Sequence, residues 1–141
     1  MKDKLQVFKE IKVNQFMIKD PIFTIPNEKI STTELLMLRK NIGSFPVVNN
    51  SNDRRVIGII NQRDIRLARF AMNIETPNTK VKDLMTPDPI IAKKTDSFIL
   101  ILEKLVKHNI ERLPIVNDNQ ELIGYITKQS IIETIYNYLN K

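Results

Sequence analysis

Hydrophobic positions in the first half of the chain change their spacing several times, and each spacing predicts one element of secondary structure. Residues 21–26 form a short β-prone run between two prolines, where the residue before each proline favours extended geometry. Helical spacing follows over residues 32–42, with apolar side chains at Leu35, Leu36, Leu38 and Ile42. Ser31 and Glu34 have the spacing of a capping box, and Gly43 is expected to end this helix.

Two runs rich in β-branched residues come next, at 45–49 and 55–60. The polar residues 50–53 between them are typical of a hairpin turn. A second helix is predicted from about Gln62, because helical spacing returns there, with Ile65, Leu67, Ala68, Phe70 and Ala71. The first half therefore predicts the order β-α-β-β-α, and residues 1–12 ahead of it predict an extra short helix.

The second half of the chain predicts the same five elements. We expect a strand at about 90–92, a helix at 96–109, strands at 113–117 and 122–127, and a helix from 128 to about 139. The polar stretch 72–80 contains a proline and is interpreted as a linker. The predicted organisation is a helical extension over 1–12, a first copy over 13–71, this linker, and a second copy over 81–141.

The two copies also share their sequence. Residues 13–22 (VNQFMIKDPI) return as 81–90 (VKDLMTPDPI), 41–49 (NIGSFPVVN) as 109–117 (NIERLPIVN), and 57–65 (IGIINQRDI) as 123–131 (IGYITKQSI). The only length difference falls in the loop between the last two blocks, where surface position tolerates it. A copy of about 60 to 70 residues is marginal alone, so we expect the two copies to pack together.

Composition narrows the class of protein. The chain has 141 residues, 42% of them hydrophobic and 27% charged, which are globular values. There is no cysteine, no signal-peptide core in the charged first ten residues, and no apolar run long enough to span a membrane, so we expect a cytoplasmic protein. The net charge of +6 suits anionic small molecules or nucleic acid. The only dense cationic run is Arg63, Arg66 and Arg69, and tryptophan is absent.

The junction between the strand 55–60 and the following helix carries candidate chemistry. Asn61 is placed at the N-cap of the helix and Asp64 at its third position. One interpretation is helix capping alone, since both residue types favour these positions. The other is a ligand site, in which the carboxylate accepts hydrogen bonds from a ribose diol while free helix amides favour phosphate oxygens.

At this point the chain resembles the CBS domain (cystathionine β-synthase domain) family. The resemblance covers residues 13–137 and rests on three features: Met-x-x-x-Pro at the start of each copy, a Pro-Val or Pro-Ile strand in its middle, and a partial match to Gly-x-x-[Thr/Ser]-x-x-Asp at its end, where the first copy keeps Asp64 and the second keeps Thr127. It implies an α+β, sandwich-like fold in which tandem β-α-β-β-α repeats are related by a pseudo-twofold axis. It further implies a stand-alone Bateman module with two clefts, and a disc-shaped homodimer.

In this family the clefts bind adenosine-containing effectors such as AMP, ADP, ATP, S-adenosylmethionine or NAD. The resemblance therefore implies a regulatory protein that binds such a ligand between its two CBS motifs and signals to a partner protein. Each cleft combines the terminal motif of one copy with the early strand and central Pro strand of the other.

The better equipped cleft is expected around Asp64, which matches the ribose-binding Asp of the motif, although Asn61 replaces the usual Thr or Ser. Arg112 stands where the family often has a basic residue that meets phosphate, and its planar fork suits phosphate oxygens. A solvated turn residue is the alternative interpretation of Arg112. The expected contacts in this cleft are Ile60, Asn61, Asp64, Lys82, Met85, Thr86, Pro89, Ile90, Glu111, Arg112, Leu113 and Pro114.

The other cleft is expected to be weaker, because Ser130 replaces the acid and Ser44 replaces the arginine. A hydroxyl makes only neutral hydrogen bonds to a diol. Lys19 is placed to compensate in part. The expected contacts are Ile18, Lys19, Pro21, Ile22, Ser44, Phe45, Pro46, Ile126, Thr127 and Ser130.

The remaining candidates favour structural roles. Met17 and Met85 suit an adenine pocket, but core filling is the favoured interpretation. His108, the single histidine, has no neighbours at metal-ligand spacing, and no catalytic or phosphate-loop motif is present, so we expect neither a metal site nor an enzyme. Two alternatives stay open: a structural or interaction module with degenerate clefts, and a nucleic-acid-binding protein using the arginine helix.

Overall fold

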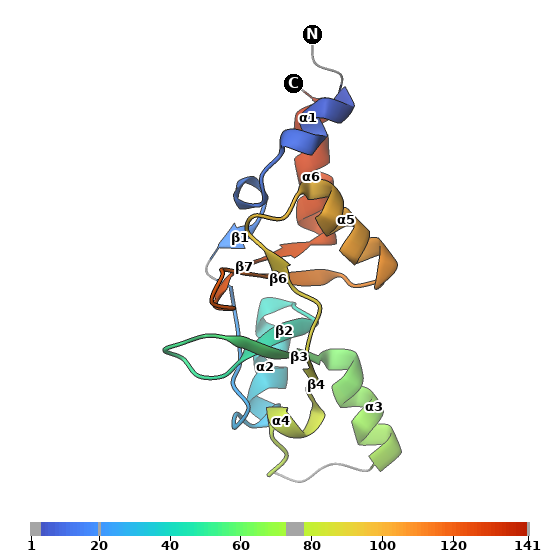
Figure 1. Cartoon of the computed structure of the whole chain (residues 1–141). Helices are drawn as coiled ribbons and strands as arrows, with labels where there is room; N and C mark the ends of the chain where they lie inside the picture. The colour runs from blue at the N-terminus through green and yellow to red at the C-terminus, as the bar shows by residue number, and fades with distance from the viewer. Residues whose placement is uncertain (1–3, 20, 73–77, 141) are drawn as a thin grey trace. The chain divides into compact units, whose positions relative to one another are not determined.

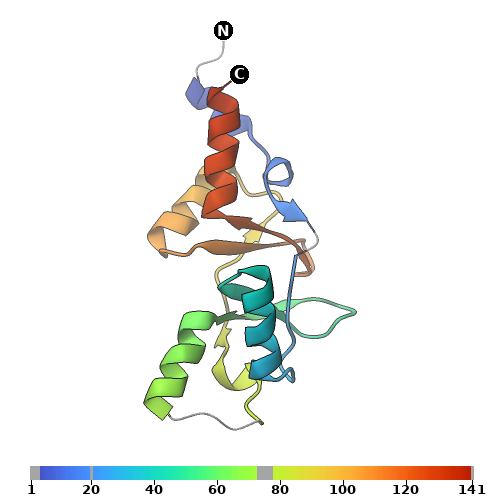
Figure 2. The ribbon, with the colours of Figure 1, turned by 180° about the vertical axis from the view of Figure 1, so that it is seen from behind.

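The computed structural model describes residues 4–19, 21–72 and 78–140, and main-chain placement alone is used for Lys4, Leu5 and Met72. The chain divides into two compact units. Unit 1 combines the residues up to Pro21 with those from Ile90 onward, and unit 2 is the continuous segment Ile22–Pro89. Each unit is coloured along the chain in Figures 1 and 2.

Unit 2 contains an antiparallel sheet in the order β2-β3-β4. Its strands and helices are α2 (Ile30–Lys40), β2 (Ser44–Val48), β3 (Val56–Asn61), α3 (Gln62–Met72), α4 (Val81–Leu84) and β4 (Thr86–Pro87). The hairpin of β2 and β3 and the helix after it confirm three of the predicted elements. The side chain of Asn50 organises the turn, since its Oδ1 accepts from the amides of Asn52 and Asp53.

Unit 1 contains a sheet in the order β1-β7-β6-β5, in which only the β5–β6 pair is parallel. Its elements are α1 (Lys4–Glu10), the 3₁₀ helix η1 (Val13–Gln15), β1 (Ile18–Lys19), β5 (Ala92–Lys93), α5 (Phe98–Lys107), β6 (Arg112–Val116), β7 (Leu122–Thr127) and α6 (Lys128–Leu139). Helix α1 matches the helix expected in the N-terminal extension. Figures 1 and 2 show α1, α5 and α6 on one side of β6 and β7.

Each unit combines the leading segment of one copy with the body of the other. We call residues 13–21 and 81–89 the leading segments, and residues 22–71 and 90–141 the bodies, of the first and second copy. Strand β1 of the first copy pairs with β7 of the second, with Ile18 opposite Tyr125. Strand β4 of the second copy pairs with β3 of the first, with Thr86 opposite Ile59, which is the equivalent register. The expectation that the terminal motif of each copy lies beside the early strand of the other is confirmed for these strands.

Helix α5 and the 3₁₀ helix η1 pack against the sheet of unit 1. In unit 1 the core joins side chains of η1, α5, β6 and β7, including Val13, Phe16, Phe98, Ile101, Leu113 and Ile126. The rings of Phe16 and Phe98 meet edge to face, with centroids 5.3 Å apart. Along β7, Ile126 is buried whereas Ile123 and Tyr125 on the alternate positions are half-buried. We call the face that carries Tyr125 and Thr127 the second face of the sheet.

Glycine is required where each leading strand crosses the body of the other copy. A Cβ added to Gly124 would lie 2.6 Å from Sδ of Met17 and 2.8 Å from the carbonyl oxygen of Ile18. A Cβ on Gly58 would lie 2.9 Å from Sδ of Met85 and 3.0 Å from a main-chain oxygen. The two thioethers also pack against the cores of their units, which favours core filling for Met17 and Met85.

The ends of the first helix differ from the sequence expectation. Helix α2 begins at Ile30 after the N-cap Lys29, which makes no side-chain cap, so the expected box of Ser31 and Glu34 is wrong. The helix ends at Lys40, and its C-cap is Asn41, in the left-handed region at φ 53°, whereas Gly43 was expected to end it. Asparagine tolerates this conformation because its short polar side chain can bond locally.

Several other element boundaries in the structure differ from the predicted ones. The strand expected over 21–26 is reduced to a single bridge between Thr24 and Val47, because prolines at both ends remove amide donors. In the second copy the helix expected over 96–109 covers Phe98–Lys107; its N-cap is Ser97, whose Oγ accepts from the Leu100 amide. The bounds of the short strands β1 and β4 were not predicted from the spacing of hydrophobic residues. Most of the predicted linker, residues 73–77, lies outside the described residues, and the boundaries of the two copies stay a prediction.

Gly124→Ala is expected to destabilise unit 1 by about 1 to 3 kcal/mol, the usual range for overpacking. The Cβ would displace Met17 and press on main chain that cannot move away. Gly43→Ala is the matched control, since nothing lies within 4 Å of its Cβ position. All three tyrosines lie in unit 1, so urea unfolding followed by tyrosine fluorescence reports on this unit. Equal midpoints for the two variants would contradict the packing described above.

Candidate functional site

The junction of β3 and α3 in unit 2 holds a carboxylate in a fixed position. Asn61 ends β3 and Asp64 is the third residue of α3, as the sequence predicted. Nδ2 of Asn61 donates to Oδ2 of Asp64 at 3.1 Å, and both residues are half-buried. Within the described residues no hydrogen bond to the other carboxylate oxygen, Oδ1, is recorded. One side of this carboxylate is thus anchored, and the other is available to a ligand.

The same junction in unit 1 is a closed helix cap. The amide of Ser130 donates to Oγ1 of Thr127 at 2.9 Å, and the amide of Thr127 donates to Oγ of Ser130 at 3.0 Å. The Ser130 hydroxyl in turn donates to the carbonyl oxygen of Thr127 at 2.9 Å. A ligand hydroxyl would have to compete with these bonds. The two copies therefore place different chemistry on the same backbone geometry.

The leading segment of the second copy lies beside the Asn61–Asp64 junction in unit 2. Strand β4 pairs with β3, and Met85 packs over Gly58. Lys82 is exposed and its amide donates to the carbonyl oxygen of Pro26 at 3.0 Å. Unit 2 therefore brings together these members of the stronger predicted cleft: Ile60, Asn61, Asp64, Lys82, Met85, Thr86 and Pro89.

Arg112 belongs to unit 1 and is the first residue of β6, not part of the preceding turn as expected. Its Cα stands opposite Thr127 in the β6–β7 ladder. Its guanidinium carbon lies 5.0 Å from the ring centroid of Tyr125, a cation–π contact. The remaining members of the stronger predicted cleft share this unit: Ile90, Glu111, Leu113 and Pro114. That the cleft residues of unit 2 and those of unit 1 form one cleft stays a prediction.

The weaker predicted cleft is divided in the same way. Unit 1 holds Ile18, Lys19, Pro21, Ile126, Thr127 and Ser130, and unit 2 holds Ile22, Ser44, Phe45 and Pro46. Ser44 stands opposite Asn61 in the β2–β3 ladder, as Arg112 stands opposite Thr127. Lys19 is exposed and lies opposite Gly124 on the edge strand β1.

Four of the candidate side chains are core residues. Ile60, Leu113 and Ile126 are fully buried, and Phe45 is 1% exposed. Each lies in the hydrophobic cluster of its own unit. These four residues can offer a ligand only their main-chain groups, so the side-chain chemistry of a site falls to the other candidates, such as Asp64 and Arg112.

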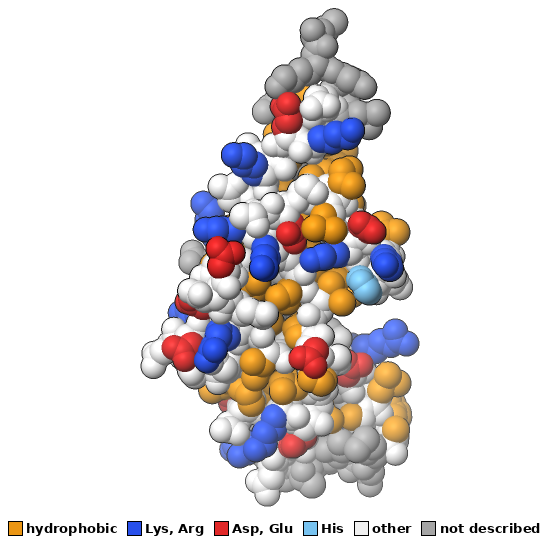
Figure 3. All heavy atoms as spheres, viewed as in Figure 1, with side chains coloured by type: hydrophobic (Ala, Val, Ile, Leu, Met, Phe, Trp, Pro, Cys, Tyr) orange, Lys and Arg blue, Asp and Glu red, His pale blue; other side chains and the backbone are white. Residues whose placement is uncertain are grey.

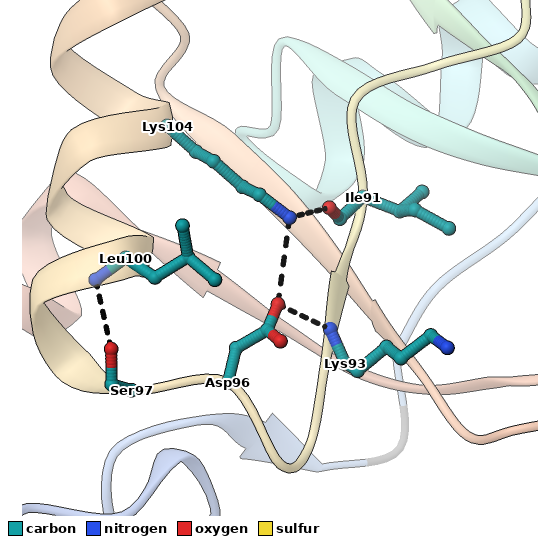
Figure 4. Close-up of polar contacts among 6 residues, drawn as sticks. All are labelled: Ile91, Lys93, Asp96, Ser97, Leu100 and Lys104. Atoms are coloured by element: carbon teal, nitrogen blue, oxygen red, sulfur yellow. Dashed lines mark hydrogen bonds and ion pairs between the residues drawn. The ribbon is translucent and has the colours of Figure 1, made fainter.

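Lys104 contacts the segment that follows Ile90 and holds it in place. Nζ of Lys104 on α5 donates to the carbonyl oxygen of Ile91 at 2.7 Å and lies 3.4 Å from Oδ2 of Asp96. The same Oδ2 accepts from the amide of Lys93 at 2.9 Å. Figure 4 shows these contacts converging between α5 and β5. The first copy has Leu36 at the position of Lys104, so this network belongs to the second copy alone.

Sequence reasoning missed Tyr125. The signal for it was present, because the two strands of the second hairpin were predicted and residues two apart on facing strands lie within reach of long side chains.

His108 stands at the C-cap of α5. In the described part of the chain no group of three or more His, Cys, Asp or Glu side chains could hold a metal ion. Among the same residues no helix is long and apolar enough to cross a membrane.

The model of the CBS domain family matches residues 13–70 and again residues 81–137. These two matches coincide with the β-α-β-β-α copies and together span most of the chain. The fold and the repeated junctions therefore define a tandem CBS-domain protein, and the chain belongs to the CBS domain family.

Curated relatives include inosine-5'-monophosphate dehydrogenase of Bacillus subtilis strain 168, which is 33% identical over 131 residues. The alignment covers 92% of this chain and 26% of that enzyme. The chain thus spans about a quarter of the length of this relative.

Solved structures agree with the fold. CBSX2 in complex with AMP superposes with a TM-score of 0.81 at 20% identity, covering 92% of this chain and 98% of that one. The CBS domain pair of protein MJ0100, in complex with 5'-methylthioadenosine and S-adenosyl-L-methionine, gives a TM-score of 0.77 at 25% identity and covers 90% of this chain and 97% of that one. The likeness to CBSX2 bears on the fold alone.

Proposed function

We propose that this chain is a regulatory module that binds an adenosine-containing ligand and signals its presence to a partner protein. The observation that carries the proposal is the carboxylate of Asp64, held by Asn61 through one oxygen and open at the other. A ribose diol offers two O–H donors to such an acceptor, and hydrogen bonds to an ionised group are about twice as strong as neutral ones.

The rest of the ligand would be met by residues of both copies. Amides in the first turn of a helix favour phosphate oxygens; in α3 the amide of Gln62 already donates to the carbonyl oxygen of Gly43 at 2.8 Å, so this role falls to the amides that follow it. Arg112 supplies a fork of donors that fits the same oxygens. Met85 and Thr86 in the leading segment of the second copy lie beside β3 in unit 2. The cleft between the two CBS motifs that would join Arg112 to the residues of unit 2 stays the prediction made from the sequence.

The class of ligand follows from this chemistry and from one solved relative. The MJ0100 domain pair, 25% identical, was solved with two adenosyl compounds. The candidates for this chain are AMP, ADP, ATP, S-adenosylmethionine and NAD, acting as effector rather than as catalytic cofactor. The other predicted cleft would bind more weakly, because the Ser130 hydroxyl is engaged in the cap of α6.

Signalling needs no catalysis. A ligand that contacts both copies stabilises the arrangement of the copies that it fits best, and a partner protein that prefers this arrangement then binds more tightly. We therefore propose a non-enzymatic role, with a cytoplasmic location as the composition predicts.

The two alternatives make contrary predictions. A module with degenerate clefts would show no thermal shift with any of the candidates, whereas a ligand at 100 times its dissociation constant stabilises by about 2.7 kcal/mol. A nucleic-acid role would use the arginines of α3, but the guanidinium of Arg69 is bound by the carboxylate of Glu34. On the face drawn in Figure 3, basic and acidic side chains are interspersed.

We also propose that the chain forms a homodimer. Helix α6 carries an apolar stripe of Ile132, Tyr136 and Leu139, exposed by 59%, 64% and 55%. Their spacing places them on one side of the helix. Figure 3 shows further hydrophobic side chains at the surface in the region of α5. A second copy of the chain would cover these residues through an equivalent surface.

Asp64→Ala is expected to weaken binding of the adenosyl ligand by about 1.5 to 3 kcal/mol, the range for hydrogen bonds to charged groups. Isothermal titration of the five candidate ligands measures the effect. Asp53→Ala is the matched control, because it removes an exposed carboxylate from the hairpin turn of the same unit. Ser130→Ala should leave this affinity unchanged. Equal affinities for wild type and Asp64→Ala would show that the site is wrongly assigned.

Tyr136→Glu is expected to shift the protein from dimer to monomer, because it places a charge in the centre of the apolar stripe. Asn137→Glu adds the same charge to the adjacent, exposed position of α6 and should leave the dimer intact. Sedimentation equilibrium of the three proteins separates these outcomes. A wild-type protein that is monomeric, or a dimer that survives Tyr136→Glu, contradicts the proposed interface.

A further inference from the structure

The guanidinium of Arg112 is held by a ring instead of by an acid. Its central carbon lies 5.0 Å from the ring centroid of Tyr125. Both side chains are half-buried. Within the described residues no carboxylate or carbonyl oxygen is recorded as an acceptor for this guanidinium, although Arg69 and Arg54 each donate to an oxygen. Arg112 thus keeps both its charge and its donors.

The sheet fixes the ring in place. Strand β7 lies between β6 and β1, so the main chain of Tyr125 is flanked by Pro114 on one side and Ile18 on the other. Arg112 pairs with Thr127 two residues further along β7. The contact between Arg112 and Tyr125 is therefore a diagonal cross-strand pair on the second face, the geometry in which long side chains meet across an antiparallel ladder.

Comparison of the copies shows that the two residues of this pair are present or absent together. At the equivalent positions the first copy has Ser44 and Ile59. It therefore lacks both the cation and the ring, while the register of the surrounding strands is the same. A ring needed only to fill the sheet surface would be of equal use in both copies, so the pairing of the two residues points to a joint role.

The physical effect of the ring is to restrain the arginine without neutralising it. A freely rotating Arg side chain loses rotamer freedom when a ligand fixes it. A cation–π contact restrains the side chain beforehand and uses the face of the guanidinium rather than its N–H edge. The donors remain for a doubly or more highly charged anion such as a phosphate group.

We propose that Tyr125 is a positioning residue that holds Arg112 for the phosphate of the adenosine ligand, and that this pair makes the site prefer phosphorylated over uncharged or cationic adenosyl compounds. The proposal rests on the proposed function, because it concerns the phosphate end of the same ligand. Tyr125 acts through Arg112 and needs no contact with the ligand.

The test compares wild type with Tyr125→Ile and Arg112→Ser, alone and together, so that the second copy acquires the residues of the first. Titration with adenosine, AMP and ATP measures each affinity. Tyr125→Ile should weaken AMP and ATP by about threefold to tenfold, the range of a half-buried cation–π contact, and leave adenosine within about twofold. Once Arg112→Ser is present, Tyr125→Ile should have no further effect.

A second substitution controls for loss of affinity through misfolding. Tyr125→Phe retains the ring and should retain the preference for AMP over adenosine, with the same melting temperature as wild type. A purely structural role predicts equal losses for adenosine and AMP, or a loss that persists beside Arg112→Ser, and either result overturns this proposal alone. Wild-type protein that binds none of the three compounds overturns this proposal, and the proposed function falls with it only when ADP, S-adenosylmethionine and NAD also fail to bind.

Discussion

The pairing of each leading strand with the hairpin of the other copy is the constraint on which the rest of the structure depends. Strands β1 and β4 have only two residues each, yet they bring Met17 and Met85 onto the bodies of the opposite copies. The approach is close enough that Gly124 and Gly58 cannot carry a side chain without displacing their neighbours. Neither copy completes its own sheet, so every surface beside the strand-to-helix junctions is made from both copies. This exchange gives a physical reason for the chain to need the repeat twice.

On this shared framework the hairpins of the two copies have equivalent registers but differ in polar chemistry. Both junctions place a side chain at the third helical position, but Asp64 is anchored through one oxygen whereas Ser130 is enclosed in a reciprocal cap. A closed cap stabilises the start of α6 and withdraws the hydroxyl from ligands. An anchored carboxylate gives up some of that capping and keeps an acceptor. The junction at Ser130 therefore favours helix stability, and the junction at Asp64 favours ligand binding.

Much of the fold could be predicted from the sequence, because its longer elements have a clear period. The two hairpins and the helices that follow them were placed nearly to the residue, and the repeat identified the equivalent registers. The exchange of leading strands was predicted only through the family resemblance, since two-residue strands show no alternation and their partners are distant in sequence. The end of α2 was misplaced because Gly43 is the better left-handed residue, yet Asn41 adopts that conformation. For the site, residue types indicated Asp64, but which of its oxygens is anchored depends on a side-chain contact that spacing does not specify.

In this chain of net charge +6, two arginines differ in the group that contacts their guanidinium. Arg69 is bound by Glu34, so its charge is compensated and its fork is occupied. Arg112 is restrained by Tyr125, and a ring compensates the charge far less than a carboxylate does. Restraint and neutralisation are thus separated: the first arginine stabilises the contact of α2 with α3, and the second is ordered but still able to bind an anion. That separation favours recognition of a charged ligand, because a mobile cation must be ordered on binding and a paired cation must give up part of its interaction with its partner.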